Sequence, residues 1–230
     1  VFVATDPVDK QLPRYMSWEQ LREISEEGVT IGSQTKFHPH MADLSRAKII
    51  DELSQSNGQF EAKLGNTPDL FAYPYGEANL ETMVLVKKAG FVAAFGQHSG
   101  AIGTGGEIYY LPRFAMNEAF GSIDRFKLAA NALPFRIADI TPDDPTIGKT
   151  NPPLIGFTVT WPDKGLDRLN CYASHVEKLM VQRLGSRFEV RAAKAMPPGR
   201  TRLNCTMPAG NGSWNWLGQQ YYVPKKNQTD

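Results

Sequence analysis

Two histidines flank a single proline in the stretch "GSQTKFHPHM", which runs from residue 32 to residue 41. They are His38 and His40, and Gln34 stands four residues before the first of them. Imidazole binds Zn, Fe, Co and Ni well, and two or three such groups with a carboxylate form an open catalytic metal site. We therefore take His38 and His40 as candidate metal ligands. The alternative is that they are loop histidines in contact with solvent.

A second turn of interest, "FAYPYGEAN", ends the next apolar run along the chain. Pro74 fixes the chain direction, and Gly76 permits a turn that exposes backbone N–H groups. Exposed amides can stabilise an oxyanion. A plain strand-to-helix turn, with Asn79 as the helix cap, is the alternative interpretation.

Both stretches follow predicted strands in a pattern of helix, glycine and strand that occurs three times. The helical segments are "WEQLREISEE", "RAKIIDELSQSNGQFEAKL" and "LETMVLVKKA", closed by Gly28, Gly65 and Gly90. Short apolar strands alternating with helices predict an α/β fold with a parallel sheet, either open or closed into a barrel. Such folds bind ligands at the carboxyl ends of their strands, where the two turns lie.

The second half of the chain predicts a different architecture. We expect an α/β domain over 1–135 and a Pro- and Asp-rich linker over 136–152. Residues 153–230 hold short strand-like runs, which predict a small β-sandwich domain. Cys171 and Cys205 both fall in that last part and are too far apart for a CxxC metal or redox motif. A structural disulfide is expected, with two buried free thiols as the alternative.

Composition excludes several classes of function. Lysine and arginine number 25 against 24 aspartate and glutamate, so no bulk field favours a nucleic-acid partner. No apolar run approaches the ~20 residues of a transmembrane helix. The expected disulfide indicates a periplasmic, cell-surface or secreted protein.

The two turns, in this order and spacing, resemble motifs of the polysaccharide deacetylases of carbohydrate esterase family 4. "IGSQTKFHPHM" is similar to the family's His-x-x-x-His motif and "FAYPYG" to its Arg-Pro-Pro-Tyr-Gly motif. "VFV" resembles the second strand of the fold, and "YYLPRFAMN" resembles a Leu-Pro-Arg stretch of members that act on bacterial surface polysaccharides. The resemblance covers residues 1–118 and implies a barrel-like (β/α) domain, incomplete at its N-terminus.

The resemblance implies a divalent metal, usually zinc, held in the family by one Asp and two His. His38 matches the second histidine, whereas Gln34 stands in place of the first, and His40 is a possible substitute ligand. The backbone N–H of Tyr75 would complete the oxyanion hole. Arg113, in "LPRF", is expected to hold a polar sugar group or a carboxylate, with a surface arginine as the alternative.

The implied reaction removes N- or O-acetyl groups from a polysaccharide, which would meet Tyr73, Pro74 and Tyr75. The family's Thr-Phe-Asp-Asp motif, which carries the metal aspartate and the general base, would precede "VFV" and has no counterpart in this chain. Two expectations therefore stay open. The chain is either part of a metal-dependent deacetylase or a catalytically impaired member that binds carbohydrate or serves as a scaffold.

Overall fold

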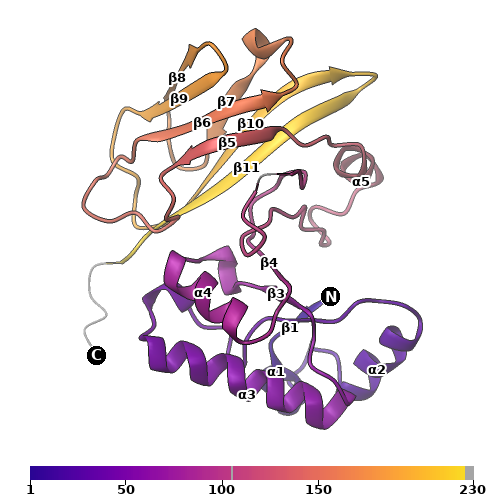
Figure 1. The fold of residues 1–230 in the computed structure, drawn as a ribbon. Coiled ribbons are helices and arrows are strands. Elements are labelled where there is room, and N and C mark those ends of the chain that lie inside the picture. The colour runs from indigo at the N-terminus through magenta and orange to yellow at the C-terminus, as the bar shows by residue number, and fades with distance from the viewer. Residues whose placement is uncertain (105, 226–230) are drawn as a thin grey trace. The chain divides into compact units, whose positions relative to one another are not determined.

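The computed structural model describes residues 1–104 and 106–225. The chain divides into two compact units, both visible in Figure 1. The N-terminal unit takes in residues 1–96 and 108–110, and the C-terminal unit takes in the others. This division differs from the expected boundary at 135, because the chain passes from one unit to the other three times.

The N-terminal unit is built on a four-stranded sheet in the order β1-β2-β3-β4. All three strand pairings are parallel. This arrangement confirms the α/β class predicted from alternating helices and apolar strands. The strands are short: β1 (Phe2–Val3), β2 (Gly32–Ser33), β3 (Leu70–Ala72) and β4 (Ala93–Phe95).

The three predicted helices of this unit are present, together with a short additional helix at Thr5–Asp9. Ser17 and Gln20 form a capping box, in which the Gln20 N–H donates to Ser17 Oγ at 3.3 Å. Gly65 ends the third helix with φ 83°, a left-handed conformation that glycine adopts without strain. The helices are α1 (Thr5–Asp9), α2 (Trp18–Glu26), α3 (Arg46–Leu64) and α4 (Leu80–Lys88).

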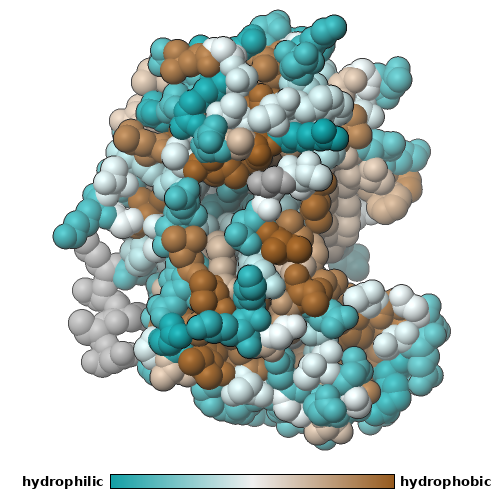
Figure 2. All heavy atoms as spheres, viewed as in Figure 1, coloured by the Kyte–Doolittle hydropathy of each residue, from teal (hydrophilic) through white to brown (hydrophobic). Residues whose placement is uncertain are grey.

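Helix α3 is the longest helix of the N-terminal unit, runs along its lower side in Figure 1 and supplies much of its core. Ile49, Leu53 and Phe60 recur at helical spacing and are at most 2% exposed. Burying side chains of this size stabilises the fold by about 1.5–3 kcal/mol each. Other hydrophobic residues lie among hydrophilic ones on the face shown in Figure 2. Within 1–104 and 106–225, no helix combines the length and the apolarity needed to cross a membrane.

The C-terminal unit holds two antiparallel sheets, of order β11-β10-β7 and β5-β6-β9-β8. One hydrophobic cluster takes residues from both sheets, among them Phe157 and Leu203. Burial alternates along β10, as the two-residue period of a strand requires. The elements are α5 (Ile123–Ala130), β5 (Arg136–Thr141), β6 (Ile155–Trp161), β7 (Asn170–Ala173), β8 (Leu179–Leu184), β9 (Arg187–Ala192), β10 (Gly199–Gly210) and β11 (Ser213–Val223).

The stretch expected as a linker over 136–152 contains β5, which pairs antiparallel with β6. Ile137 on this strand is 9% exposed, and Ile147 beyond it is 3% exposed, so both join the core. The sequence did not predict this strand because the segment is rich in Pro and Asp, which are typical of turns. A strand of six residues gives only a weak alternation signal beside them.

The predicted disulfide between Cys171 and Cys205 is confirmed. The two cysteines face each other across β7 and β10, where they are register partners. The crosslink therefore joins neighbouring strands of one sheet and closes a loop over a sequence separation of 34 residues. Both cysteines are buried within the hydrophobic cluster of the C-terminal unit.

Replacing both Cys171 and Cys205 by serine should lower the free energy of unfolding of the C-terminal unit by about 2–4 kcal/mol, because the unfolded chain regains loop entropy. Urea titration followed by tryptophan fluorescence measures this, since Trp161, Trp214 and Trp216 all lie in that unit. The reduced wild type is the matched control and should unfold near the same midpoint as the variant. An unchanged midpoint in both would contradict a stabilising disulfide.

Candidate active site at the strand ends

The turn after β3 holds Tyr75 in a backbone conformation that is rare for a residue with a side chain. Pro74–Gly76 forms a short 3-10 turn (η2), in which Tyr75 has φ 57° and ψ 2°. Such geometry costs about 1–3 kcal/mol and persists only where the surroundings enforce it. Here the Tyr110 hydroxyl donates to the Gly76 carbonyl oxygen at 2.7 Å within the core. The turn thereby fixes the directions of the Tyr75 amide and ring.

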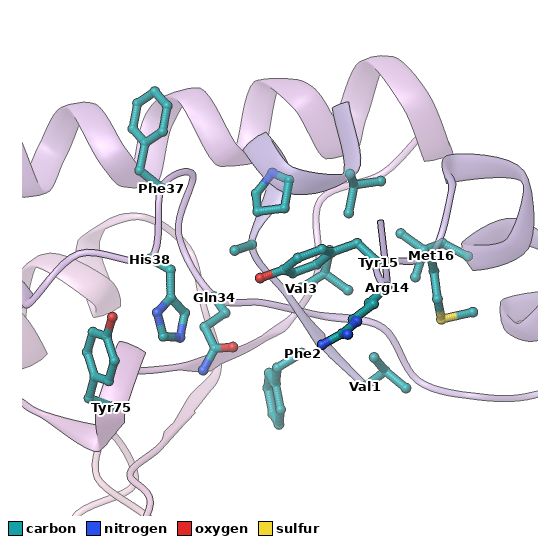
Figure 3. A pocket seen from close by; sticks show the side chains of 14 residues that line it. Val1, Phe2, Val3, Arg14, Tyr15, Met16, Gln34, Phe37, His38 and Tyr75 are labelled. Carbon is teal, nitrogen blue, oxygen red and sulfur yellow. The ribbon is translucent and has the colours of Figure 1, made fainter. Parts of the chain in front are cut away.

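The loop after β2 contains two more residues with positive φ, Thr35 at 67° and His38 at 59°. The His38 N–H donates to Thr35 Oγ1 at 3.0 Å, which closes a tight turn. The turn sends the His38 side chain into a cavity of about 580 Å³ that Gln34 and Tyr75 also border. Figure 3 shows the His38 imidazole between these two side chains. The structure thus brings residues from the ends of β2 and β3 together.

The rest of the cavity wall comes from the N-terminal segment, from α2 and from the loop after β2 (Figure 3). It is mainly apolar and aromatic, with Arg14 as its charged side chain. Pockets of about 300–1,000 Å³ with a few convergent polar groups are typical of small-molecule sites. The remaining lining residues are Val1, Phe2, Val3, Ala4, Pro7, Val8, Tyr15, Met16, Leu21 and Phe37.

The environment of His38 favours its neutral imidazole. Burial is the largest influence and lowers the pKa of His38, and the nearby His40 lowers it further. A hydrogen bond with the backbone of His38 acts in the opposite direction. Because the neutral ring keeps a lone pair, His38 is suited to bind a metal ion or to accept a proton.

His40 is held by two contacts on the same turn. Its Nδ1 lies 2.6 Å from Glu77 Oε2, and the Glu77 side chain is only 2% exposed. Its ring stacks on the Tyr75 ring with centroids 4.2 Å apart and planes inclined by 13°. The His38 ring meets Tyr75 edge-on, with centroids 4.6 Å apart. Tyr75 therefore contacts both histidines, and Glu77 is hydrogen-bonded to one of the two ring nitrogens of His40.

Residues 1–94 match the family model described as polysaccharide deacetylase. Residues 1–94 carry a polysaccharide deacetylase domain. The family indicated by the two turns in the sequence is thereby confirmed for this part of the chain.

Proteins similar to this chain come from several bacteria. YxkH of Bacillus subtilis (strain 168), named as a polysaccharide deacetylase, is 25% identical over 113 residues, which cover 47% of this chain and 40% of YxkH. The Streptococcus pyogenes deacetylase PplD is 18% identical with a TM-score of 0.48, over 51% of this chain and 52% of PplD. BC0361, a polysaccharide deacetylase from Bacillus cereus, is 20% identical with a TM-score of 0.48, over 56% of this chain and 40% of BC0361. This chain therefore spans about half the length of these relatives or less.

The described residues of the deacetylase domain do not fit a complete zinc site. Catalytic zinc usually takes three protein ligands, drawn from His, Cys and carboxylates. Within 1–104 and 106–225, no three or more such side chains come together. His38 and His40 are both near Tyr75, but Gln34 offers only a neutral amide oxygen.

The other predicted site residues, Tyr73, Pro74 and Arg113, are not among those that line the cavity. Tyr73 is 0% exposed, and its side chain packs against Phe71 and Tyr110. Its backbone N–H donates to the Phe95 carbonyl oxygen at 3.0 Å, so neither its side chain nor its backbone is open to a ligand. Pro74 is buried as well. Arg113 belongs to the C-terminal unit, where its N–H donates to the His98 carbonyl oxygen at 2.9 Å. Burial lowers the pKa of Arg113, and Arg202 adds to the effect.

Sequence reasoning missed Glu77, although it directly follows the "YPYG" turn. A carboxylate at a strand end beside a buried turn was a usable signal, because burying a charge requires a partner. The partner, His40, is 37 residues away in sequence. Their contact follows only from the pairing of β2 with β3, which places the two turns at one edge.

Proposed function

We propose that this chain belongs to an enzyme that hydrolyses N- or O-acetyl groups of a polysaccharide and releases acetate. The observation that carries the proposal is the convergence of His38 and the Tyr75 turn on one cavity within a polysaccharide deacetylase domain. Water would attack the acetyl carbon, and the sugar amine or hydroxyl would leave. The sugar would lie against Tyr75, which lines the cavity, whereas Tyr73 and Pro74 are buried.

We assign roles to the residues by their chemistry. The backbone N–H of Tyr75 would donate to the oxyanion that forms on the acetyl carbonyl, and the rigid turn would hold that donor in place. Arg113 would hold a polar group of the polymer, as its forked guanidinium suits carboxylates and hydroxyls. The role of Tyr75 is the deacetylase family's role carried to the matching position, whereas the role of Arg113 rests on the chemistry of its side chain.

We further propose that a divalent metal, zinc in the first instance, takes part and lies nearest His38, His40 and Gln34. The two imidazoles support this assignment, since nitrogen ligands suit such metals. The described residues do not complete the ligand set, and the roles of Tyr75 and Arg113 do not depend on the metal.

The proposal extends to the fold and the location. The parallel sheet would belong to a barrel-like (β/α) domain, and the two antiparallel sheets would form an appended β-sandwich that helps to position the polymer. A periplasmic, cell-surface or secreted location agrees with the disulfide, which persists in oxidising compartments.

A second function is favoured by one observation, the amide of Gln34 at the position of a metal histidine. A neutral amide is a weak zinc ligand. On this alternative the chain retains the deacetylase fold and binds carbohydrate, or serves as a scaffold, without turnover.

Acetate release from N-acetylglucosamine oligomers and from an O-acetylated polysaccharide distinguishes the deacetylase function from the non-catalytic one. We expect release at least tenfold above the blank, loss of that activity after chelator treatment, and recovery when Zn, Co or Ni is added back. Metal content of the purified protein is measured in parallel. Oligomer binding without acetate release under any of these metals would favour the non-catalytic alternative.

A further inference from the structure

Helix α3 presents a polar stripe beside its apolar one. Four polar side chains recur at spacings of three and four residues and therefore share one face of the helix. Each of them hydrogen-bonds to β2 or to the segments that follow β1 and β2. The four are Glu52, Gln55, Ser56 and Gln59. A stripe of this kind is unusual on the inward side of a helix, where apolar contacts stabilise most.

Glu52 makes the contacts nearest to the cavity. Its Oε2 accepts hydrogen bonds from the backbone N–H groups of Lys36, at 3.1 Å, and Phe37, at 2.9 Å. Successive amides that converge in this way form a nest, which binds an anion. Here the anion is a carboxylate of the same chain. The ammonium of Lys36 donates to Gln55 instead, so Glu52 bonds to the backbone of the loop.

The nest lies between the two left-handed residues of the loop, Thr35 and His38. A residue with a side chain leaves this conformation unless neighbouring groups hold it. The His38 N–H is held from within the loop by Thr35 Oγ1. The Lys36 and Phe37 amides are held from outside the loop by Glu52. The loop conformation that directs His38 into the cavity is thus tied to α3 by this carboxylate.

We propose that Glu52 is a positioning residue, which keeps the His38 loop in its left-handed conformation and so keeps the imidazole in the cavity. Its catalytic consequence rests on the proposed deacetylase function, whereas its effect on the loop does not. Without the Glu52 carboxylate, the Lys36 and Phe37 amides donate to water instead. Thr35 and His38 then return toward negative φ values, and the His38 ring moves away from Tyr75. Glu52 itself is not among the residues that line the cavity.

The test compares Glu52→Ala with Glu52→Gln, which retains an acceptor oxygen at the same reach. For the alanine variant we expect kcat for acetate release to fall by about ten- to a hundredfold with little change in KM, since a small displacement of a site residue has effects of this size. Glutamine should restore kcat to within about threefold of wild type. Asp51→Ala, an exposed neighbour on the same helix, is the matched control and should behave as wild type.

NMR provides a readout that does not depend on turnover. In Glu52→Ala the amides of Lys36 and Phe37 should lose protection from hydrogen exchange, and the His38 ring resonances should shift. Both should return in Glu52→Gln. If the wild type releases no acetate but these signals change, the proposed function fails and the positioning role stands.

Two results would overturn the proposal. One is a folded Glu52→Ala protein with wild-type His38 resonances and amide protection. The other is a loss of kcat in Glu52→Ala that glutamine does not restore. If the alanine variant fails to fold, Glu52→Asp replaces it, because a carboxylate one methylene shorter cannot reach both amides. A folded aspartate variant with unshifted His38 resonances and kcat would equally contradict the role.

Discussion

His38→Ala is expected to lower acetate release by about a hundredfold or more, the usual effect of losing a side chain that binds or transfers protons at the reacting centre. The imidazole is the ionisable group that the β2 loop directs into the cavity beside Tyr75. Its loss leaves the cavity wall and the Tyr75 turn in place. The defect should therefore appear mainly in kcat.

The assay measures acetate release at saturating substrate, and thermal unfolding of each variant checks that the fold is intact. His175→Ala is the matched control, because His175 is an exposed histidine of the C-terminal unit. It should retain wild-type kcat. Activity of His38→Ala close to wild type would place the reacting centre elsewhere, and the deacetylase assignment of this cavity would have to be abandoned.

Acid is expected to destabilise the C-terminal unit through His98, which is 1% exposed. Burial, with the charges of Arg202 and Arg113, lowers the pKa of His98 to about 3. An unfolded histidine titrates near pH 6.5. Above pH 6.5 neither state binds the extra proton, and stability is unaffected. Between pH 6.5 and about 3 only the unfolded chain binds it, so stability falls as the pH falls.

The free energy of unfolding should therefore decline by up to about 1.4 kcal/mol per pH unit across this window, from His98 alone. Urea titrations between pH 7 and pH 4 measure the slope for wild type and for His98→Asn. The asparagine variant should show a shallower slope, whatever its stability at pH 7. His175→Asn serves as the control and should follow the wild-type slope. Equal slopes for wild type and His98→Asn would show that His98 is not the titrating group.

Local signals in the sequence predicted much of the N-terminal unit. The Ser17 and Gln20 capping box and the stop at Gly65 act within one turn of helix, so they can be read without knowing the fold. Short apolar strands between such helices then fix a parallel sheet. The strand ends follow from this order, which is why Gln34, His38 and Tyr75 could be expected in one region.

The remaining features depend on contacts between distant parts of the chain. Glu52 reaches the Lys36 amide from 16 residues away, and Glu77 reaches His40 from 37 residues away. No period or cap in the sequence encodes such a pairing. The positive φ of Tyr75 could not be predicted from the sequence either, since tyrosine seldom adopts such a conformation and nothing in its neighbours requires it. Strain of this kind is set by tertiary packing.

The interleaving of the two units determines how this protein can be cut. Residues 97–107 and everything from 111 onward belong to the C-terminal unit, whereas 108–110 belong to the N-terminal one. A cut after residue 96 removes Tyr110, whose hydroxyl bonds to the Gly76 carbonyl oxygen of the turn after β3. A cut at 135 leaves part of the C-terminal unit attached to the deacetylase domain. Neither unit can be isolated whole by a single cut, and exchanging the C-terminal unit between relatives would require three junctions, after residues 96, 107 and 110.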